Sequence, residues 1–269
     1  MTSELDMVNL YIDLMKKVLT ATIYDQNSWG VNQSRKNNYF RKLLSRYLKS
    51  KSMLLINTNQ FSKSAMEEGR GWSIFGFTMV GHRRLDNVQL CLDEVLKNNI
   101  PGDLVETGSW RGGTTIFMRA LLKAYNITDR KVWVADSFEG LPVPKNQEDG
   151  KDLSNIDYLK VPLEQVKLNF EKFNLLDEQV EFIKGWFCDS LPKAPIDKIA
   201  ILRLDGDLYS STMDSLENLY HKVSKGGFII VDDYYSWPSC RKAVTDFLES
   251  NSLQPEIKKI DWTGAYWQI

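Results

Sequence analysis

Downstream of Pro101, short apolar segments alternate with longer segments of helical periodicity, and this alternation constrains the fold more than any other feature. The apolar segments predict strands at 103–107, 131–136, 180–186, 199–204 and 227–231. Helices are expected at 114–125, 162–173, 213–223 and 240–249. Because strands that alternate with helices build a mainly parallel sheet, the pattern predicts an α/β fold.

Two further strand-like segments close the chain, at 255–260 and 265–269. The turn Trp262-Thr263-Gly264 between them predicts a hairpin, which adds antiparallel strands to the parallel set. The expected sheet is therefore seven-stranded and mainly parallel, with a C-terminal antiparallel hairpin. In open sheets of this kind ligands bind at the carboxyl ends of the strands, so functional residues are expected there.

Residues 1–100 have a different pattern, mostly helix and loop, which divides the chain into a helical region at 1–100 and an α/β domain at 101–269. One apolar helix face is expected near the start, formed by Met7, Leu10, Tyr11, Leu14, Met15, Val18 and Leu19. A second helix is expected over 85–97, and Pro101-Gly102 ends it.

The composition excludes several classes of protein. With 34 basic and 35 acidic residues there is no positive excess, so nucleic acid is not an expected partner. No apolar run approaches 18 residues and the first residues do not resemble a signal peptide, so neither a membrane span nor secretion is expected. The three cysteines have no paired spacing, which favours a reducing, cytoplasmic location.

The turn after the first parallel strand reads Glu-Thr-Gly-Ser-Trp-Arg-Gly-Gly from Glu106 to Gly113. Glycines there let the backbone approach a ligand, and the start of the next helix offers free amide donors. The spacing differs from the dinucleotide pattern G-x-G-x-x-G, and a carboxylate at Glu106 would repel phosphate and attract an ammonium group. The turn indicates a site for a nucleoside or amino-acid moiety, with an ordinary strand–helix turn as the alternative.

Single acids follow the second and third parallel strands. Asp136 at the end of the second strand could accept both hydroxyl groups of a ribose. Asp189 after the third strand could hold the exocyclic amine of adenine, with Trp186 or Phe187 packed on the ring. Helix capping is the alternative role for both acids.

Pairs of acids follow the fourth and fifth parallel strands, as Asp205 with Asp207 and Asp232 with Asp233. Carboxylates that converge in a cleft need a counter-charge, and a hard cation such as Mg²⁺ supplies it. Adjacent residues of a regular strand point to opposite faces, so Asp232 and Asp233 can share an ion only if the strand ends at or before them. Helix capping by one acid is the alternative, and with two histidines in the chain a zinc site is not expected.

Taken together, these motifs resemble the macrocin O-methyltransferase family, whose members use S-adenosylmethionine and Mg²⁺ to methylate sugar hydroxyls of antibiotics. The matching segments run in family order over about residues 65 to 269: 79–81, 84–87, 105–113, 135–142, 185–187, 202–212, 226–227 and 232–234. The resemblance implies a Rossmann-like methyltransferase fold with an N-terminal helical lid region.

The resemblance also assigns roles to particular positions. It implies that the cofactor contacts Thr78, Met79, Glu106, Thr107, Gly108, Ser109, Asp136, Ser137, Phe138, Cys188 and Asp189. It implies that the metal ligands are Asp205, Asp232 and Asp233, that Asp205 is also the general base, and that Asp207 is not a ligand. A sugar-containing acceptor and a homodimer or higher oligomer are expected, and His82 and His221 are alternative bases. A metal-dependent hydrolase that uses the same acids is the alternative function.

Overall fold

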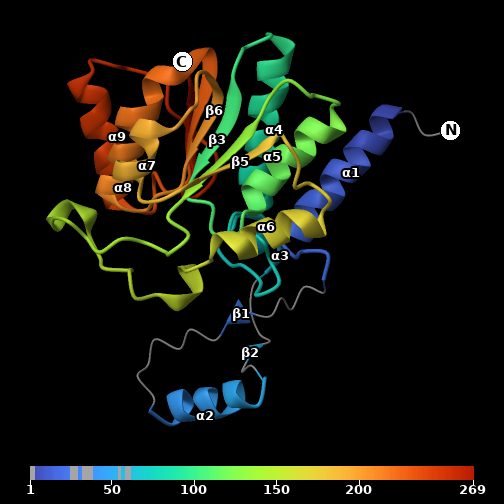
Figure 1. Ribbon diagram of the computed structural model, residues 1–269, viewed down its shortest axis with the longest axis vertical. Coiled ribbons are helices and arrows are strands. Elements are labelled where there is room, and N and C mark those ends of the chain that lie inside the picture. The colour runs from blue at the N-terminus through green and yellow to red at the C-terminus, as the bar shows by residue number, and fades with distance from the viewer. Residues whose placement is uncertain (1–3, 25–29, 32–38, 54–55, 58–61) are drawn as a thin grey trace.

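The computed structural model describes residues 4–24, 30–31, 39–53, 56–57 and 62–269. A seven-stranded sheet with the order β5-β4-β3-β6-β7-β9-β8 forms its centre (Figure 1). The strands are β3 (Asp103–Thr107), β4 (Val132–Asp136), β5 (Val180–Lys184), β6 (Ile199–Leu204), β7 (Val223–Val231), β8 (Lys258–Lys259) and β9 (Ala265–Gln268). The strands from β5 to β7 pair in parallel, whereas β9 pairs antiparallel with β7 and β8, so the predicted sheet and hairpin are confirmed.

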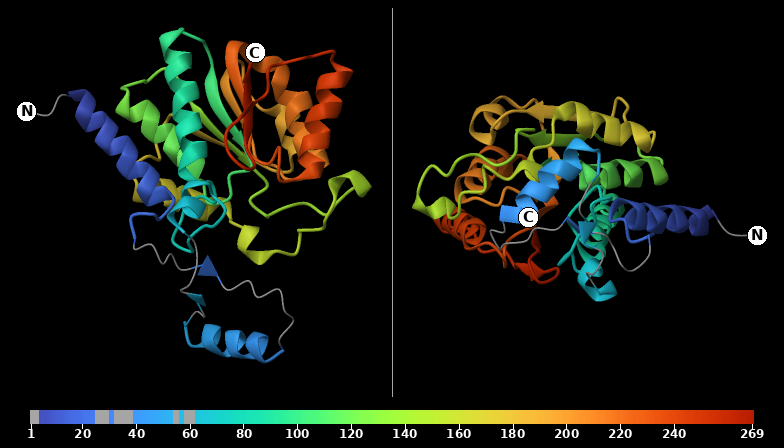
Figure 2. Two further views of the ribbon diagram at one scale, coloured as in Figure 1. Left: turned by 180° about the vertical axis from the view of Figure 1, so that it is seen from behind. Right: turned by 90° about the horizontal axis from the view of Figure 1, so that it is seen from below.

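Helices cover both faces of the sheet (Figures 1 and 2). One side carries α1 (Glu4–Leu19), α4 (His82–Lys97), α5 (Gly113–Ala124) and α6 (Leu163–Lys172), and the other carries α7 (Phe187–Ser190), α8 (Tyr209–Leu219) and α9 (Pro238–Ser250). Alternate strand residues point to the two layers, as the pleat requires. Leu104 and Val132 belong to the first apolar cluster, whereas Val105 and Trp133 belong to the second.

The N-terminal helices share the core of the sheet rather than forming one of their own. Leu85, Val88 and Leu92 of α4 are fully buried in the first cluster, together with Ile12 and Met15 of α1. The division at residue 100 stays a prediction, although the packing on its two sides is continuous.

The predicted apolar face of α1 is partly wrong. Ile12, Met15 and Leu19 are buried, whereas Met7, Leu10 and Leu14 are about half exposed at 57%, 59% and 49%. Apolar residues surround most of this helix, so periodicity alone does not choose the side that packs on α5.

Short elements also lie between α1 and α4: β1 (Gly30–Val31) pairs with β2 (Ile56–Asn57), and α3 (Lys63–Glu67) precedes α4. Figure 1 shows α2 (Tyr39–Ser50) standing away from the sheet, where Leu43, Leu44 and Tyr47 are exposed. Within the described residues, no helix is both long and apolar enough to cross a membrane.

One helix begins earlier than expected. α8 starts at Tyr209 rather than at 213, because its first turn has a buried partner. The carboxylate of Asp149, from a 3₁₀ turn at Gln147–Asp149, accepts a hydrogen bond from the Ser210 amide at 2.7 Å and one from the Lys145 amide at 2.7 Å. This contact fastens the long connection after β4 to the helix that follows β6.

Candidate active site

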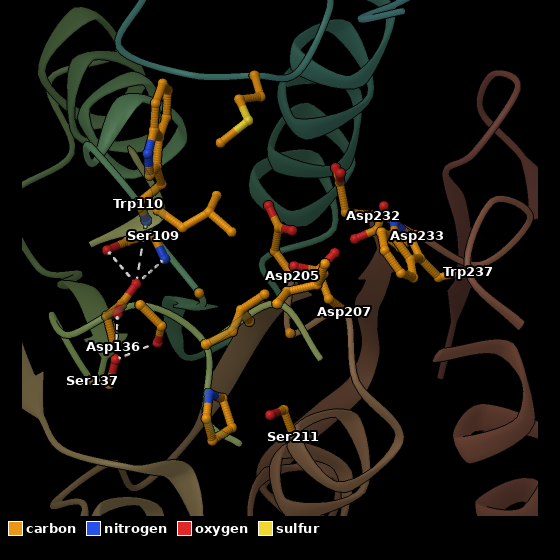
Figure 3. A pocket seen from close by; sticks show the side chains of 18 of the residues that line it. Ser109, Trp110, Asp136, Ser137, Asp205, Asp207, Ser211, Asp232, Asp233 and Trp237 are labelled. Atoms are coloured by element: carbon orange, nitrogen blue, oxygen red, sulfur yellow. Dashed lines mark hydrogen bonds between the residues drawn. The ribbon is translucent and has the colours of Figure 1, made fainter. Parts of the chain in front are cut away.

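A cavity of about 1020 Å³ opens at the carboxyl ends of β3, β4, β6 and β7. Its lining includes most of the predicted site residues, namely Thr78, Met79, Glu106, Gly108, Ser109, Asp136, Ser137, Cys188, Asp189, Asp205, Asp232 and Asp233. Figure 3 shows Ser109, Trp110 and Asp136 on one side of the pocket and the acids Asp205, Asp207, Asp232 and Asp233 on the other. The structure therefore brings the predicted cofactor and metal residues into one cavity.

The two sides meet at Gly108, which has a φ of +91°. A Cβ atom at this position would lie 1.8 Å from the backbone oxygen of Asp205, so a side chain cannot be accommodated. The amide of Asp205 also donates to the carbonyl of Thr107 at 2.8 Å. The glycine thus allows the turn after β3 to touch the turn after β6.

Glu106 is a buried carboxylate with one free oxygen. Its side chain is 1% exposed, and Arg203 donates a hydrogen bond to Oε1. Among the described residues Oε2 has no hydrogen-bond partner, although Glu106 lines the cavity. Burial raises the pKa of Glu106 to about 7, against the lowering effect of Arg203. A ligand with a positively charged donor would satisfy this oxygen.

Asp136 has all its short contacts within the protein (Figure 3). Oδ2 accepts hydrogen bonds from the amides of Ser109 at 2.7 Å and Trp110 at 3.2 Å, and Oδ1 accepts one from the Phe138 amide at 2.8 Å. Burial raises its pKa, and these backbone hydrogen bonds oppose the rise. The side chain thus fastens the glycine-rich turn to the end of β4, a role that the sequence did not predict.

On the opposite side, Asp205, Asp207 and Asp233 each place a carboxylate oxygen within 4.8 Å of the others. Burial and mutual repulsion raise the pKa of Asp205 and of Asp233 well above the usual range, and burial raises that of Asp207 to about 6. Such a group of oxygen donors fits a hard divalent cation, which would relieve the repulsion.

This cluster differs from the predicted ligand set in one member. Asp232 lies beside it, but its two oxygens accept hydrogen bonds from Arg203 and Arg84. Asp207, which the resemblance left out, takes its place in the cluster and has a left-handed backbone conformation with a φ of +57°. Asp205 and Asp233 are common to both sets.

Some expected residues lie outside the lining of the cavity. Thr107 is fully buried and its hydroxyl accepts a hydrogen bond from Ser215 on α8 at 3.1 Å. Phe138 packs in the first apolar cluster, with its ring 6.4 Å from that of Phe182. His82 and His221 are also absent from the part of the lining that the structure describes, and His82 instead contacts the Thr22 hydroxyl at 2.8 Å.

Aromatic residues form another wall of the cavity, where the expected Trp186 and Phe187 are joined by residues that the sequence did not indicate. Trp72 packs against Trp110 and Tyr158, with ring centroids 5.2 and 5.6 Å apart, and the Trp110 indole donates to the Tyr158 carbonyl at 2.7 Å. Trp186, Phe187, Trp237 and Trp262 also line the cavity. These residues come from separate loops, so no local pattern marks them as one surface.

Arg203 also belongs to the site, although no motif assigned it a role. The sequence around it did indicate that it is unusual. It is a charged residue inside the apolar strand Ile-Ala-Ile-Leu-Arg-Leu, where a buried cation is costly unless acids surround it. The structure supplies three such acids, Glu106, Asp205 and Asp232.

Fold and site together define an α/β enzyme domain whose cavity lies at the ends of parallel strands. The sequence matches the family described as Macrocin-O-methyltransferase (TylF) over residues 8–269, and the chain belongs to this family. It is 44% identical to a demethyldecarbamoylnovobiocin O-methyltransferase of Streptomyces niveus, over 97% of this chain and 93% of the relative. It is 38% identical to a mycinamicin III 3''-O-methyltransferase of Micromonospora griseorubida, over 97% and 96%.

Solved structures agree with this assignment. The structure of the O-methyltransferase NovP superposes with a TM-score of 0.83 at 43% identity, covering 97% of this chain and 98% of that one. CalS11, a calicheamicin methyltransferase, has a TM-score of 0.60 at 17% identity and shares the fold. The protein is therefore an O-methyltransferase, and the alternative of a metal-dependent hydrolase is not supported.

Proposed function

We propose that the enzyme transfers a methyl group from S-adenosylmethionine to a sugar hydroxyl of a glycoside, with Mg²⁺ at the acid cluster. The observation that carries the proposal is a single cavity with an unsatisfied buried carboxylate, Glu106, on one side and three converging carboxylates on the other. The first fits an ammonium group such as that of the methionine moiety, and the second fits a hard cation.

On the cofactor side, the chain's task is to hold and orient. Glu106 would accept a hydrogen bond from the amino group through Oε2, and Gly108 in the adjoining turn also lines the cavity where the methionine moiety would lie. Asp136 keeps the Ser109 and Trp110 amides in place, so its effect on the ribose side is through the turn as well as through any direct contact. Cys188 and Asp189 remain the proposed adenine side.

On the acceptor side, Mg²⁺ when bound would lower the pKa of a coordinated hydroxyl. Asp205 and Asp233 are the proposed ligands, with Asp207 as the third carboxylate in this conformation and Asp232 as the third implied by the resemblance. Asp205 is the proposed base, because it lies between the glycine-rich turn and the other acids and is 28% exposed to the cavity side. The aromatic wall excludes water and can pack on the apolar faces of a sugar ring.

Relatives support the acceptor class. Two of them are named for O-methylation of demethyldecarbamoylnovobiocin and of mycinamicin III, and a third, 44% identical and from Streptomyces olivaceus, for 4'-O-methylation of a rhamnosyl tetracenomycin. We extend only the general class, a sugar-bearing small molecule, to this protein. Action in the cytoplasm and assembly as a homodimer or larger oligomer remain predictions.

The test is calorimetric titration with S-adenosylhomocysteine, followed by methyl transfer to a panel of deoxysugar glycosides with Mg²⁺ or with EDTA. Micromolar binding that Glu106→Ala weakens, and methylation that EDTA abolishes, are the expected results. A folded protein that does not bind S-adenosylhomocysteine would refute the cofactor assignment. Methylation that continues unchanged in EDTA would refute the metal.

A further inference from the structure

Arg203 lies between the two sides of the cavity, and its side chain is 1% exposed. Its Nη1 atom donates hydrogen bonds to Glu106 Oε1 and, at 2.8 Å, to Asp205 Oδ2. Its Nη2 atom donates to Asp232 Oδ1. One guanidinium therefore joins three carboxylates that stand at the ends of three adjacent strands, β3, β6 and β7.

The strand register fixes this arrangement. Arg203 is the Cα partner of Glu106 on β3 and of Ile230 on β7, so its side chain projects from the same face of the sheet as that of Glu106. A buried guanidinium is stable only when acids surround it, and the planar fork holds each of them in a defined direction. A movement of Asp205 is thus transmitted to Glu106 through a single nitrogen atom.

We propose that Arg203 is a positioning residue that couples the two ligands, so that Mg²⁺ at the acid cluster raises the affinity for S-adenosylmethionine and S-adenosylhomocysteine. This inference rests on the proposed function. Arg203 touches neither the cofactor nor the acceptor in this scheme and acts through Glu106 and Asp205.

The direction of the coupling follows from the shared nitrogen. An ion bound by Asp205 fixes that carboxylate, and Asp205 in turn fixes the guanidinium and Glu106. The cofactor's amino group then binds a carboxylate that is already ordered. The entropy loss of ordering Glu106 therefore belongs to the binding of the ion and not to the binding of the cofactor. Thermodynamic linkage requires that the bound cofactor raise the affinity for Mg²⁺ by the same factor.

The experiment measures the dissociation constant of S-adenosylhomocysteine by calorimetry, in EDTA and in saturating Mg²⁺. For the wild type, Mg²⁺ should lower this constant about tenfold, within the usual range of coupling between sites. Arg203→Lys keeps the charge but cannot bridge three acids, so the ratio should fall to about one. Arg119→Lys is the matched control, because Arg119 is also buried, at 6% exposed, and pairs with Asp177 through two hydrogen bonds away from the cavity.

Each outcome decides the matter. A wild type that binds S-adenosylhomocysteine equally well with and without Mg²⁺, or an Arg203→Lys variant that keeps the tenfold ratio, overturns the coupling but leaves the proposed function standing. A wild type that does not bind S-adenosylhomocysteine at all refutes the proposed function instead. Should Arg203→Lys fail to fold, the reciprocal ratio is measured with Mg²⁺ as the titrant on Glu106→Gln, and a ratio as large as that of the wild type overturns the inference.

Discussion

The two sides of the cavity satisfy their acids in different ways. On the cofactor side, Asp136 is saturated by backbone amides of Ser109, Trp110 and Phe138, all of which belong to the chain itself. On the metal side, Asp205, Asp207 and Asp233 face one another, and the pKa of each is raised by burial. Asp136 is thus satisfied by the protein alone, whereas Glu106 Oε2 on the same side lacks a partner among the described residues and the cluster on the metal side needs a cation from outside.

This difference teaches which part of the site is preformed. A carboxylate that receives three amide donors holds its turn in one conformation before any ligand binds. Carboxylates that repel one another attract a cation, but they destabilise the protein when no cation is bound. The predictions below test that contrast, from the largest expected effect to the smallest.

The largest effect is expected for Asp205→Asn. Loss of a metal ligand that is also the proposed base should lower the rate of methyl transfer on the order of 10²-fold or more. Binding of S-adenosylhomocysteine in EDTA should change much less than the rate, because Asp205 reaches Glu106 only through Arg203 and the contacts of Asp136 do not involve it. Asp152→Asn, an exposed acid outside the site, is the control, and a variant as active as this control would contradict the base assignment.

A large effect on stability is expected for Asp136→Ala. Three buried or half-buried amides lose their acceptor, which should lower the free energy of unfolding by about 2 kcal/mol at neutral pH. Urea denaturation measures this loss, and calorimetry should show weaker binding of S-adenosylhomocysteine in the same variant. A variant of unchanged stability would show that the turn does not depend on Asp136.

The third metal ligand can be identified with a pair of variants. If Asp207 completes the site as in this conformation, Asp207→Asn should raise the Mg²⁺ concentration for half-maximal activity about tenfold, and Asp232→Asn should raise it less. The opposite order would show that Asp232 exchanges its arginine partners for the ion, as the resemblance implies.

Asp177, an acid that does not line the cavity, serves as a comparison for the acids on its two sides. Arg119 donates two hydrogen bonds to Asp177, at 2.9 and 2.6 Å, and they lower the pKa of this carboxyl. Its folded pKa is below the unfolded value, so the stabilisation is complete above about pH 4 and is lost as the pH falls through the folded pKa.

Asp177→Asn should therefore lower the free energy of unfolding by about 1 kcal/mol at pH 7. The difference in this free energy from the wild type should shrink below about pH 3. Urea denaturation of the variant and the wild type at pH 7 and below about pH 3 measures this difference. A difference that is the same at both pH values would show that charge is not the cause.

Much of this molecule follows from patterns that are local in sequence. The alternation of apolar strands and helices predicts the parallel sheet, and the turn at 262–264 predicts the antiparallel hairpin. Both predictions use only residues that are close together in the sequence. Acids at strand ends are also predictable as site residues, since a parallel sheet brings those ends together. Asp205, Asp233 and Glu106 were identified in this way, and all of them line the cavity.

What could not be predicted depends on contacts between distant segments. Asp207 and Asp232 each belong to an acidic pair that follows a buried strand, and the positions of Arg84 and Arg203 make Asp232 an ion-paired acid rather than a member of the cluster. Thr107 follows Glu106 directly, yet it points to α8 because adjacent strand residues face opposite sides. The aromatic wall likewise comes from loops far apart in the chain.

Arg84 has a consequence for engineering this enzyme. It belongs to α4, yet its Nη1 atom pairs with Asp232 after β7 and its Nε atom donates to Asp261 in the C-terminal hairpin at 3.1 Å. A chimera that takes its first hundred residues from a relative would therefore replace one partner of a buried ion pair without the others. A crossover placed just before α4, ahead of Gly81, would keep Arg84 with its native acids, while the exchanged part would include α1 and the loop that carries Trp72.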